Sequence, residues 1–332
     1  PCALALATPT ALTTATGSLH KLGMLLTRGH VIEGLNQIDT LVLDKTGTLT
    51  EGRLTLKAIH PLRDLDEGAC LALAAALENR SEHPIARAFS QAPRAAQSVD
   101  SHPGQGLQGS VDGRLLRIGE ASFVCALSGQ AVPMIASEHG QWLLLGDEQG
   151  PLAWFVLDDR LREDAPDLIA AARARGWNIH LLSGDSSPMV AEVARQLGIE
   201  DARGGLTPDA KLAVLKQLHS EGRRVLMLGD GVNDVPVLAA ADISVAMGSA
   251  SDLAKTSADA VLLSNRLGSL VDGLKLAKRT RRIIIENLAW ATLYNGLVLP
   301  FAALGWITPI WAAVGMSLSS LLVVLNALRL SR

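Results

Sequence analysis

The chain has 332 residues, of which 48% are hydrophobic and 19% charged, and its mean hydropathy is +0.25. This length exceeds one ordinary domain, and the hydropathy indicates that part of the chain lies in a membrane. A net charge of −3 gives no electrostatic basis for binding nucleic acid. The three cysteines are too widely scattered for a zinc site or a disulfide framework.

The first residues form an apolar run that opens without an initiator Met and reads as the middle of a helix. We therefore expect residues 1–38 to contain the end of a core transmembrane helix and a cytoplasmic linker. The chain then reads as a fragment of a longer protein.

The seven residues Asp44-Lys45-Thr46-Gly47-Thr48-Leu49-Thr50 are the most informative segment, because they follow the strand-like apolar run at 40–43 directly. A carboxylate on such a turn can accept a phosphoryl group, which makes Asp44 a candidate nucleophile. Thr46, Gly47 and Thr48 supply hydroxyl and backbone donors for phosphate oxygens. The alternative for Asp44 alone is an N-capping residue before a polar turn.

Short apolar runs alternate with amphipathic helical stretches from about residue 151 to 272, which predicts an α/β fold with a parallel, doubly wound sheet. The expected strands at 178–182, 225–228 and 243–247 end in polar or Gly-containing turns, as the run at 40–43 does. Ligands in such sheets lie at the carboxyl ends of strands. Residues 39–52 and 151–272 then form one domain, and 53–150 form a smaller inserted α+β domain.

Phosphoryl transfer requires a nucleophile, a carboxylate for Mg²⁺ and a cation for the phosphate oxygens. Asp230, on a Gly-containing turn, is the candidate Mg²⁺ ligand together with Asp44 and Thr46. Lys211 is the candidate cation. At the end of another expected strand, a hydroxyl and backbone N–H groups are added by Ser183, Gly184 and Asp185.

Together these motifs resemble the haloacid-dehalogenase-like phosphorylation domain of P-type ATPases, ion pumps that cycle through a phosphorylated Asp. Gly229-Asp230-Gly231-Val232-Asn233-Asp234 matches the hinge motif of that family, so the resemblance implies catalytic roles for Asn233 and Asp234 and also for Lys45 and Thr48. Ser183 replaces the usual Thr, and Val235-Pro236-Val237 replaces the commoner Ala-Pro-Ala. Both changes are mild.

Ser81-Glu82-His83-Pro84 narrows the resemblance to heavy-metal-transporting P-type ATPases, whose nucleotide domain carries this signature. The resemblance implies that the inserted domain binds ATP through the residues Glu78, His83, Gly104, Gly106 and Gly119. Glycines at such positions permit close approach of the nucleotide. Glu120 departs from the Asn that the family commonly has after Gly119.

No charged residue lies between Glu286 and Arg329, a stretch about twice the roughly 20 residues that span a bilayer. We expect a transmembrane helical hairpin over residues 273–332, with its turn near Gly305 to Pro309. Lys and Arg flank both ends, so the positive-inside rule places both ends in the cytoplasm. A buried soluble hairpin is the alternative.

The Pro1-Cys2 pair resembles the remainder of a Cys-Pro-Cys membrane motif. In the copper(I)/silver(I) branch, the matching helices carry further pairs, and the resemblance assigns transported Cu⁺ (or Ag⁺) to Cys2, Tyr294, Asn295, Met316 and Ser319. Thiol and thioether groups favour soft monovalent ions. Ordinary helix packing is the alternative for Met316 and the serines.

The chain is thus expected to be the C-terminal portion of a copper(I)-exporting P-type ATPase in a multi-pass, bacterial inner or plasma membrane, with cytoplasmic catalytic domains. ATP, Mg²⁺, membrane lipid, the metal ion and a copper chaperone are the expected partners. No Thr-Gly-Glu occurs in the chain, so the dephosphorylation loop is expected elsewhere. A zinc/cadmium pump, a soluble phosphatase of the same superfamily and a non-catalytic truncated membrane partner remain alternatives.

Overall fold

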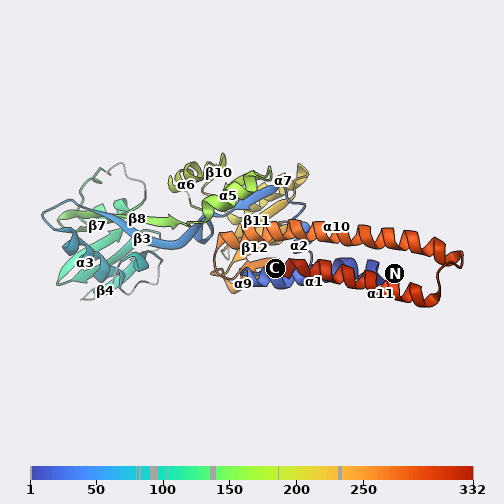
Figure 1. Ribbon diagram of the computed structural model, residues 1–332. Coiled ribbons are helices and arrows are strands. Elements are labelled where there is room, and N and C mark those ends of the chain that lie inside the picture. Colours follow the sequence, from blue (N-terminus) through green and yellow to red (C-terminus); the bar gives the residue numbers. More distant parts are fainter. Residues whose placement is uncertain are drawn as a thin grey trace.

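The computed structural model describes residues 2–79, 81, 84–89, 96–102, 104–134, 140–185, 187–230 and 234–331. Figure 1 shows an antiparallel sheet at one end, a parallel sheet with helices in the middle, and long helices that extend from the parallel sheet at the other end. The predicted α/β class, with an inserted α+β unit, is confirmed.

The central sheet has seven strands in the order β1-β13-β12-β11-β2-β9-β10. All neighbouring pairs are parallel except β1 with β13. Strands β2, β11 and β12 are buried along their whole lengths, as expected for a sheet covered on both faces. The strand bounds are β1 Met24–Leu26, β2 Thr40–Leu43, β9 Asn178–Leu182, β10 Asp201–Arg203, β11 Val225–Gly229, β12 Ile243–Met247 and β13 Ala260–Leu262.

Short helices connect these strands and pack against the sheet. They are amphipathic: α6, for example, buries Val190, Val193 and Leu197 and ends at Gly198, whose φ of 65° permits the left-handed helix cap. The helix bounds are α2 Val31–Gly34, α5 Ala165–Arg173, α6 Met189–Leu197, α7 Pro208–Ser220, α8 Val235–Ala240 and α9 Asp252–Ser257.

The second sheet has six antiparallel strands in the order β3-β8-β7-β6-β5-β4, and helix α3 packs on it. Its elements are β3 Thr50–Pro61, α3 Glu67–Glu78, a 3₁₀ turn Pro84–Ala88, β4 Gln97–His102, β5 Gly106–Val111, β6 Arg114–Gly119, α4 Ala121–Cys125, β7 Gln141–Asp147 and β8 Gly150–Leu161. The sheet extends past the expected limits of 53 and 150, because β3 and β8 pair from Thr50↔Leu161 onward.

Three long helices, α1 Cys2–Lys21, α10 Leu267–Ala303 and α11 Pro309–Leu328, lie together at the other end of the molecule (Figure 1). Ala3, Ala7, Ala291 and Val323 form a small buried cluster among them. A final 3₁₀ turn covers Arg329–Ser331. The turn between α10 and α11 lies where the sequence predicts it.

Among the described helices, one is long and apolar enough to cross a membrane, and it spans Pro309–Ser331. The expectation of two such helices in the hairpin is therefore met for α11 alone. Helix α10 is continuous, but Asn287, Tyr294 and Asn295 give its C-terminal half several polar groups, which lower its mean hydropathy.

Candidate active site

The carboxyl ends of three neighbouring strands bring the predicted site residues together. Asp44 follows β2, Ser183 follows β9 and Asp230 follows β11, and β2 lies between the other two strands with parallel pairing on both sides. The Asp44 backbone N–H donates to Leu228 O at 3.0 Å, which continues the ladder to the last residue before the turn. Parallel strands place such ends at one edge, so the crevice follows from the topology.

The loop after Asp44 requires glycine at its centre. Gly47 has φ of 72°, and a Cβ built on it would lie 1.6 Å from Asp230 Oδ2. The backbone of the loop can therefore approach the Asp230 carboxylate only because this side chain is missing. The contact ties the first predicted motif to the second, although they are far apart in the sequence.

Lys211 lies between two carboxylates. Its Nζ is 2.5 Å from Asp44 Oδ1 and 2.7 Å from Asp234 Oδ1, and all three side chains are buried. Helix α7 presents Lys211 one turn from its start, where Thr207 Oγ1 caps Ala210 N at 3.2 Å. Burial opposes the charge of the ammonium, but Asp44 and Asp234 outweigh this effect and raise the pKa of Lys211.

The carboxylates of Asp44, Asp230 and Asp234 offer oxygens that all lie within 4.8 Å of one another. Burial raises the pKa of Asp44 to about 6 and that of Asp230 to about 7, and in each case a neighbouring carboxylate adds to the rise. Burial and mutual repulsion therefore oppose ionisation of these carboxyls, whereas Lys211 and Arg162 favour it, and a bound cation would relieve the repulsion. This donor set of hard oxygens fits one Mg²⁺ ion.

Gly184 and Asp185, in the turn after β9, line the crevice, and Lys45 supports Asp185 from outside it. Lys45 Nζ is 2.5 Å from Asp185 Oδ2, and this hydrogen bond helps to lower the pKa of Asp185 against the effect of burial. Ser183 Oγ accepts from Asp185 N at 3.1 Å, so this hydroxyl shapes its own turn. The crevice forms a cavity of about 410 Å³, lined also by Thr46 and Gly184.

Three predicted residues, Lys45, Thr48 and Ser183, do not line the cavity. Thr48 is fully buried, and its Oγ1 has no hydrogen-bond partner among the described residues. Asn233 lies outside the described residues, as do the glycine and valine before it.

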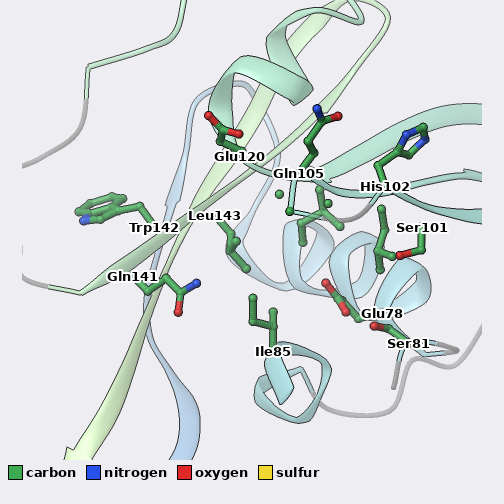
Figure 2. Close-up of a pocket in the computed structure, with 15 residues that line it drawn as sticks. Glu78, Ser81, Ile85, Ser101, His102, Gln105, Glu120, Gln141, Trp142 and Leu143 are labelled. Carbon is green, nitrogen blue, oxygen red and sulfur yellow. The ribbon is translucent and has the colours of Figure 1, made fainter. Parts of the chain in front are cut away.

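A second cavity of about 430 Å³ lies on the six-stranded sheet beside α3 (Figure 2). The predicted residues Glu78, Gly104, Gly106 and Gly119 line it, whereas His83 lies outside the described residues. The sequence reasoning missed further lining residues, including His102, Gln105, Ile118, Gln141, Trp142 and Leu143. Gln105 stands inside the Gly104–Gly106 motif, whereas strand pairing brings Ile118 and Leu143 to the pocket and no local motif marks them.

Gly106 and Gly119 face each other at the end of the antiparallel pair β5–β6, beside this pocket. Their φ angles are 149° and 147°, and a Cβ on Gly106 would lie 2.1 Å from Ile118 O, as one on Gly119 would lie 2.1 Å from Gln105 O. Gly104 has φ of 74°, but a Cβ there would meet open space. Two of the three glycines are therefore required by the close approach of backbones within the fold.

Glu78 is the buried acid of this pocket, and its side chain projects from α3 toward the cavity in Figure 2. Burial raises the pKa of Glu78 to about 7, and a hydrogen bond from Ser81 opposes the rise. Its Oε2 has no hydrogen-bond partner among the described residues. Glu120, the departure from the family pattern, is exposed at the rim.

The four described residues expected to bind the transported ion lie on α10 and α11. A Cβ on Gly315 would lie 2.2 Å from Tyr294 Oη, so the tyrosine packs beside the residue before Met316. Asn295 Nδ2 donates to Ala291 O within its own helix, and Ser319 is buried. Met316 is 40% exposed, and the side chain of Cys2 is outside the described part.

A family model described as haloacid dehalogenase-like hydrolase matches residues 38–242. The chain belongs to the haloacid dehalogenase-like hydrolase family. The match covers β2 with Asp44 and continues through the Asp230 turn.

Longer relatives match over essentially the whole chain. It is 40% identical to the nitrogen fixation protein FixI of Rhizobium leguminosarum bv. viciae, with 100% of this chain and 43% of the relative covered. It is 36% identical to a probable copper-exporting P-type ATPase V of Mycobacterium tuberculosis, with 100% and 45% covered. The chain therefore spans less than half the length of these relatives.

Solved structures of heavy-metal P-type ATPases also match the chain. A zinc-transporting PIB-type ATPase in an E2·Pi state superposes with a TM-score of 0.84 and 33% identity, covering 100% of this chain and 56% of that one. A catalytic domain of the CPx-ATPase CopB-B gives a TM-score of 0.66 and 29% identity, covering 78% and 98%. The resemblance to heavy-metal P-type ATPases expected from the sequence is confirmed.

Proposed function

We propose that this hydrolase chain is the catalytic and C-terminal part of an ATP-driven heavy-metal pump that forms an aspartyl-phosphate on Asp44. One observation carries the proposal: Asp44, Lys211, Asp230 and Asp234 converge in one cavity at one edge of the sheet. This set combines a nucleophile, a cation and a metal-binding carboxylate group, as phosphoryl transfer requires.

In the proposed reaction, a carboxylate oxygen of Asp44 donates an electron pair to the γ-phosphorus of ATP. The bond from this phosphorus to the β–γ bridging oxygen breaks, and ADP leaves with that electron pair. Lys211, 2.5 Å from Asp44 Oδ1, is placed to neutralise charge on the transferred group. Mg²⁺ held by Asp44, Asp230 and Asp234 would supply further charge neutralisation. Attack of water on the aspartyl-phosphate then releases phosphate.

The second cavity is the proposed ATP pocket. Its volume of about 430 Å³ suits a nucleoside, and the unpaired Oε2 of Glu78 is an acceptor for an exocyclic amino group. The proposed role of His83 rests on its motif alone. A soluble phosphatase of the same superfamily requires no such nucleotide pocket, which disfavours that alternative.

The proposed cargo is Cu⁺ or Ag⁺. Between Glu286 and Arg329 no Asp or Glu carboxylate is available to hold a strongly hydrated divalent ion, whereas Cys2 and Met316 offer sulfur. Several relatives are described as copper pumps, and this supports the proposal. A zinc cargo is the second candidate, because a zinc transporter shares the fold at a TM-score of 0.84.

Membrane insertion with the two sheets in the cytoplasm belongs to the same proposal. Large apolar side chains at the hairpin turn are exposed, with Trp306, Ile310 and Trp311 each at least 70% accessible. Lys278, Arg279, Arg281 and Arg282 precede the apolar part of α10, so the positive-inside rule favours a multi-pass protein with this orientation. A copper chaperone is proposed as the ion donor.

The test uses the whole protein in lipid vesicles. Addition of Cu⁺ should stimulate transfer of label from γ-labelled ATP to protein, and Zn²⁺ should not. Asp44→Asn should abolish the label, while Met316→Leu should abolish its stimulation by Cu⁺ and leave ATP binding intact. Equal stimulation by Zn²⁺ would assign the cargo to the zinc class, and label that persists in Asp44→Asn would overturn the phosphoryl-transfer proposal itself.

A further inference from the structure

Arg162, the residue directly after β8, makes contacts that the proposed reaction does not use. Its Nε donates to Thr48 O at 2.8 Å and its Nη2 to Gly47 O at 3.0 Å, both in the loop after Asp44. Its Nη1 donates to Asn265 O at 3.1 Å. Asn265 lies two residues before helix α10, so one guanidinium joins the catalytic loop to the start of that helix.

Arg162 takes part in none of the ion pairs found between described residues. The three hydrogen bonds that its side chain donates all go to backbone carbonyls. A planar guanidinium presents several donors in a fixed fork, and it can therefore fix the relative positions of three acceptors. Lysine carries the same charge but only one nitrogen, so it cannot hold three separate carbonyls in this arrangement.

The same short segment attaches to α10 a second time. Asp164 Oδ2 accepts from Gly268 N at 2.9 Å, in the first turn of α10. Asp164 precedes α5, yet its side chain caps the first turn of the other helix and makes no cap bond in α5. A bond from Arg162 N to Leu49 O at 2.8 Å adds another link to the catalytic loop. We call Arg162–Asp164 the bridge segment.

Asn265, whose carbonyl two residues before α10 accepts from Arg162, has further contacts of its own. Asn265 has φ of 54°, a left-handed conformation that asparagine adopts more readily than most residues. Its Oδ1 accepts from Ser249 N at 2.7 Å, which ties it to the turn after β12. The carbonyl that Arg162 holds therefore belongs to a residue that is also bonded to the turn after β12.

We infer that Arg162 is a positioning residue that couples the conformation of the phosphorylation loop to the first turn of α10, through the bridge segment. Helix α10 runs without a break from this turn to Tyr294 and Asn295. A shift of Gly47 or Thr48 when Asp44 reacts thus changes the anchor of a helix that carries proposed ion-binding residues. The inference rests on the proposed function of Asp44.

Hydrogen exchange of the chain in detergent micelles tests the coupling directly. The probe is beryllium fluoride with Mg²⁺, which mimics a phosphoryl group on a carboxylate. In the wild-type chain, the probe should slow exchange in two segments, the loop 45–49 and the first turn of α10 at 265–271. In Arg162→Lys, the loop should still respond, whereas the response of 265–271 should be lost.

Without the probe, Arg162→Gln should speed exchange in both segments by about tenfold, because each loses a charge-assisted hydrogen bond. Arg160→Gln is the matched control: it removes the same charge two residues earlier, where Arg160 pairs only with the exposed Glu163 among the described ion pairs. It should alter neither segment. Arg162→Lys serves if Arg162→Gln fails to fold.

The inference is overturned if 265–271 responds to the probe in Arg162→Lys as it does in the wild type. It is also overturned if Arg162→Gln changes the loop alone, which would make Arg162 a purely local support. If beryllium fluoride alters nothing at 45–49 even in the wild type, the proposed reaction at Asp44 fails first, and the coupling fails with it.

Discussion

The buried carboxyl of Glu78 should make the stability of the six-stranded sheet depend on pH. Its side chain lies in the second cavity at 6% accessibility, and burial raises its pKa from 4.5 to about 7. Each pKa unit corresponds to about 1.4 kcal/mol, so the charged form costs the folded state up to about 3 kcal/mol. Glu78→Gln removes that charge and keeps the shape of the side chain.

The direction of the pH dependence of stability follows from proton uptake on folding. The folded state holds the proton on Glu78 up to about pH 7, and the unfolded state releases it near 4.5. Folding therefore takes up a proton between these values, and stability falls as the pH rises through this window. Glu78→Gln should stabilise the sheet fully above pH 7, progressively less as the pH falls, and not at all below 4.5.

Amide hydrogen exchange in β6 and β7 of the whole chain measures this effect, with wild type and variant compared at the same pH. At pH 8, exchange in Glu78→Gln should be slower by up to about a hundredfold, and at pH 4.5 it should equal that of the wild type. Glu120→Gln, at an exposed carboxylate of the same cavity, is the control and should have no effect. A difference that does not vary with pH, or faster exchange in Glu78→Gln at pH 8, would refute the reasoning.

Two glycine substitutions test the geometry of the two cavities. Gly47→Ala places a methyl group against Asp230 and should abolish the Mg²⁺-dependent beryllium fluoride response of the catalytic loop, measured by hydrogen exchange, whereas Gly29→Ala meets open space and should retain it. Gly119→Ala should weaken ATP binding at least about tenfold in a calorimetric titration, because the added Cβ would collide with the backbone. Gly104→Ala is the control: its Cβ meets open space and costs only about 1 kcal/mol of backbone strain, so the affinity for ATP should stay within a few-fold of the wild type. Normal loop response or normal affinity in the first member of either pair would contradict the description of that cavity.

The catalytic strands were predictable because each combines a local apolar run with a polar turn. The expected strands at 40–43, 178–182 and 243–247 have the same bounds in the structure, and the topology brings their ends together. The limits of the inserted sheet were not predictable in this way. β3 and β8 form their long pair between segments about a hundred residues apart, and periodicity within one segment carries no information about that pairing.

The contacts of Arg162 at the catalytic loop were likewise not predictable from the sequence. Its three acceptors are backbone carbonyls of two separate segments, and carbonyl groups occur at every residue, so no residue type marks them. Lys211 was predictable because it has a local signal, the spacing Pro-x-x-Lys from Pro208. The polarity of α10 was underestimated for a related reason, since a search for charged residues alone overlooks Asn287, Tyr294 and Asn295.

The central claim is that Asp44 itself carries the transferred phosphoryl group. Borohydride reduces an aspartyl-phosphate to homoserine, so the protein can be incubated with Mg²⁺ and ATP, quenched in acid, reduced and sequenced by mass spectrometry. The account predicts homoserine at position 44, and none in Asp44→Asn or without Mg²⁺. Homoserine at position 230 or 234 in its place, or an unmodified Asp44 in protein that carries acid-stable phosphate, would contradict it.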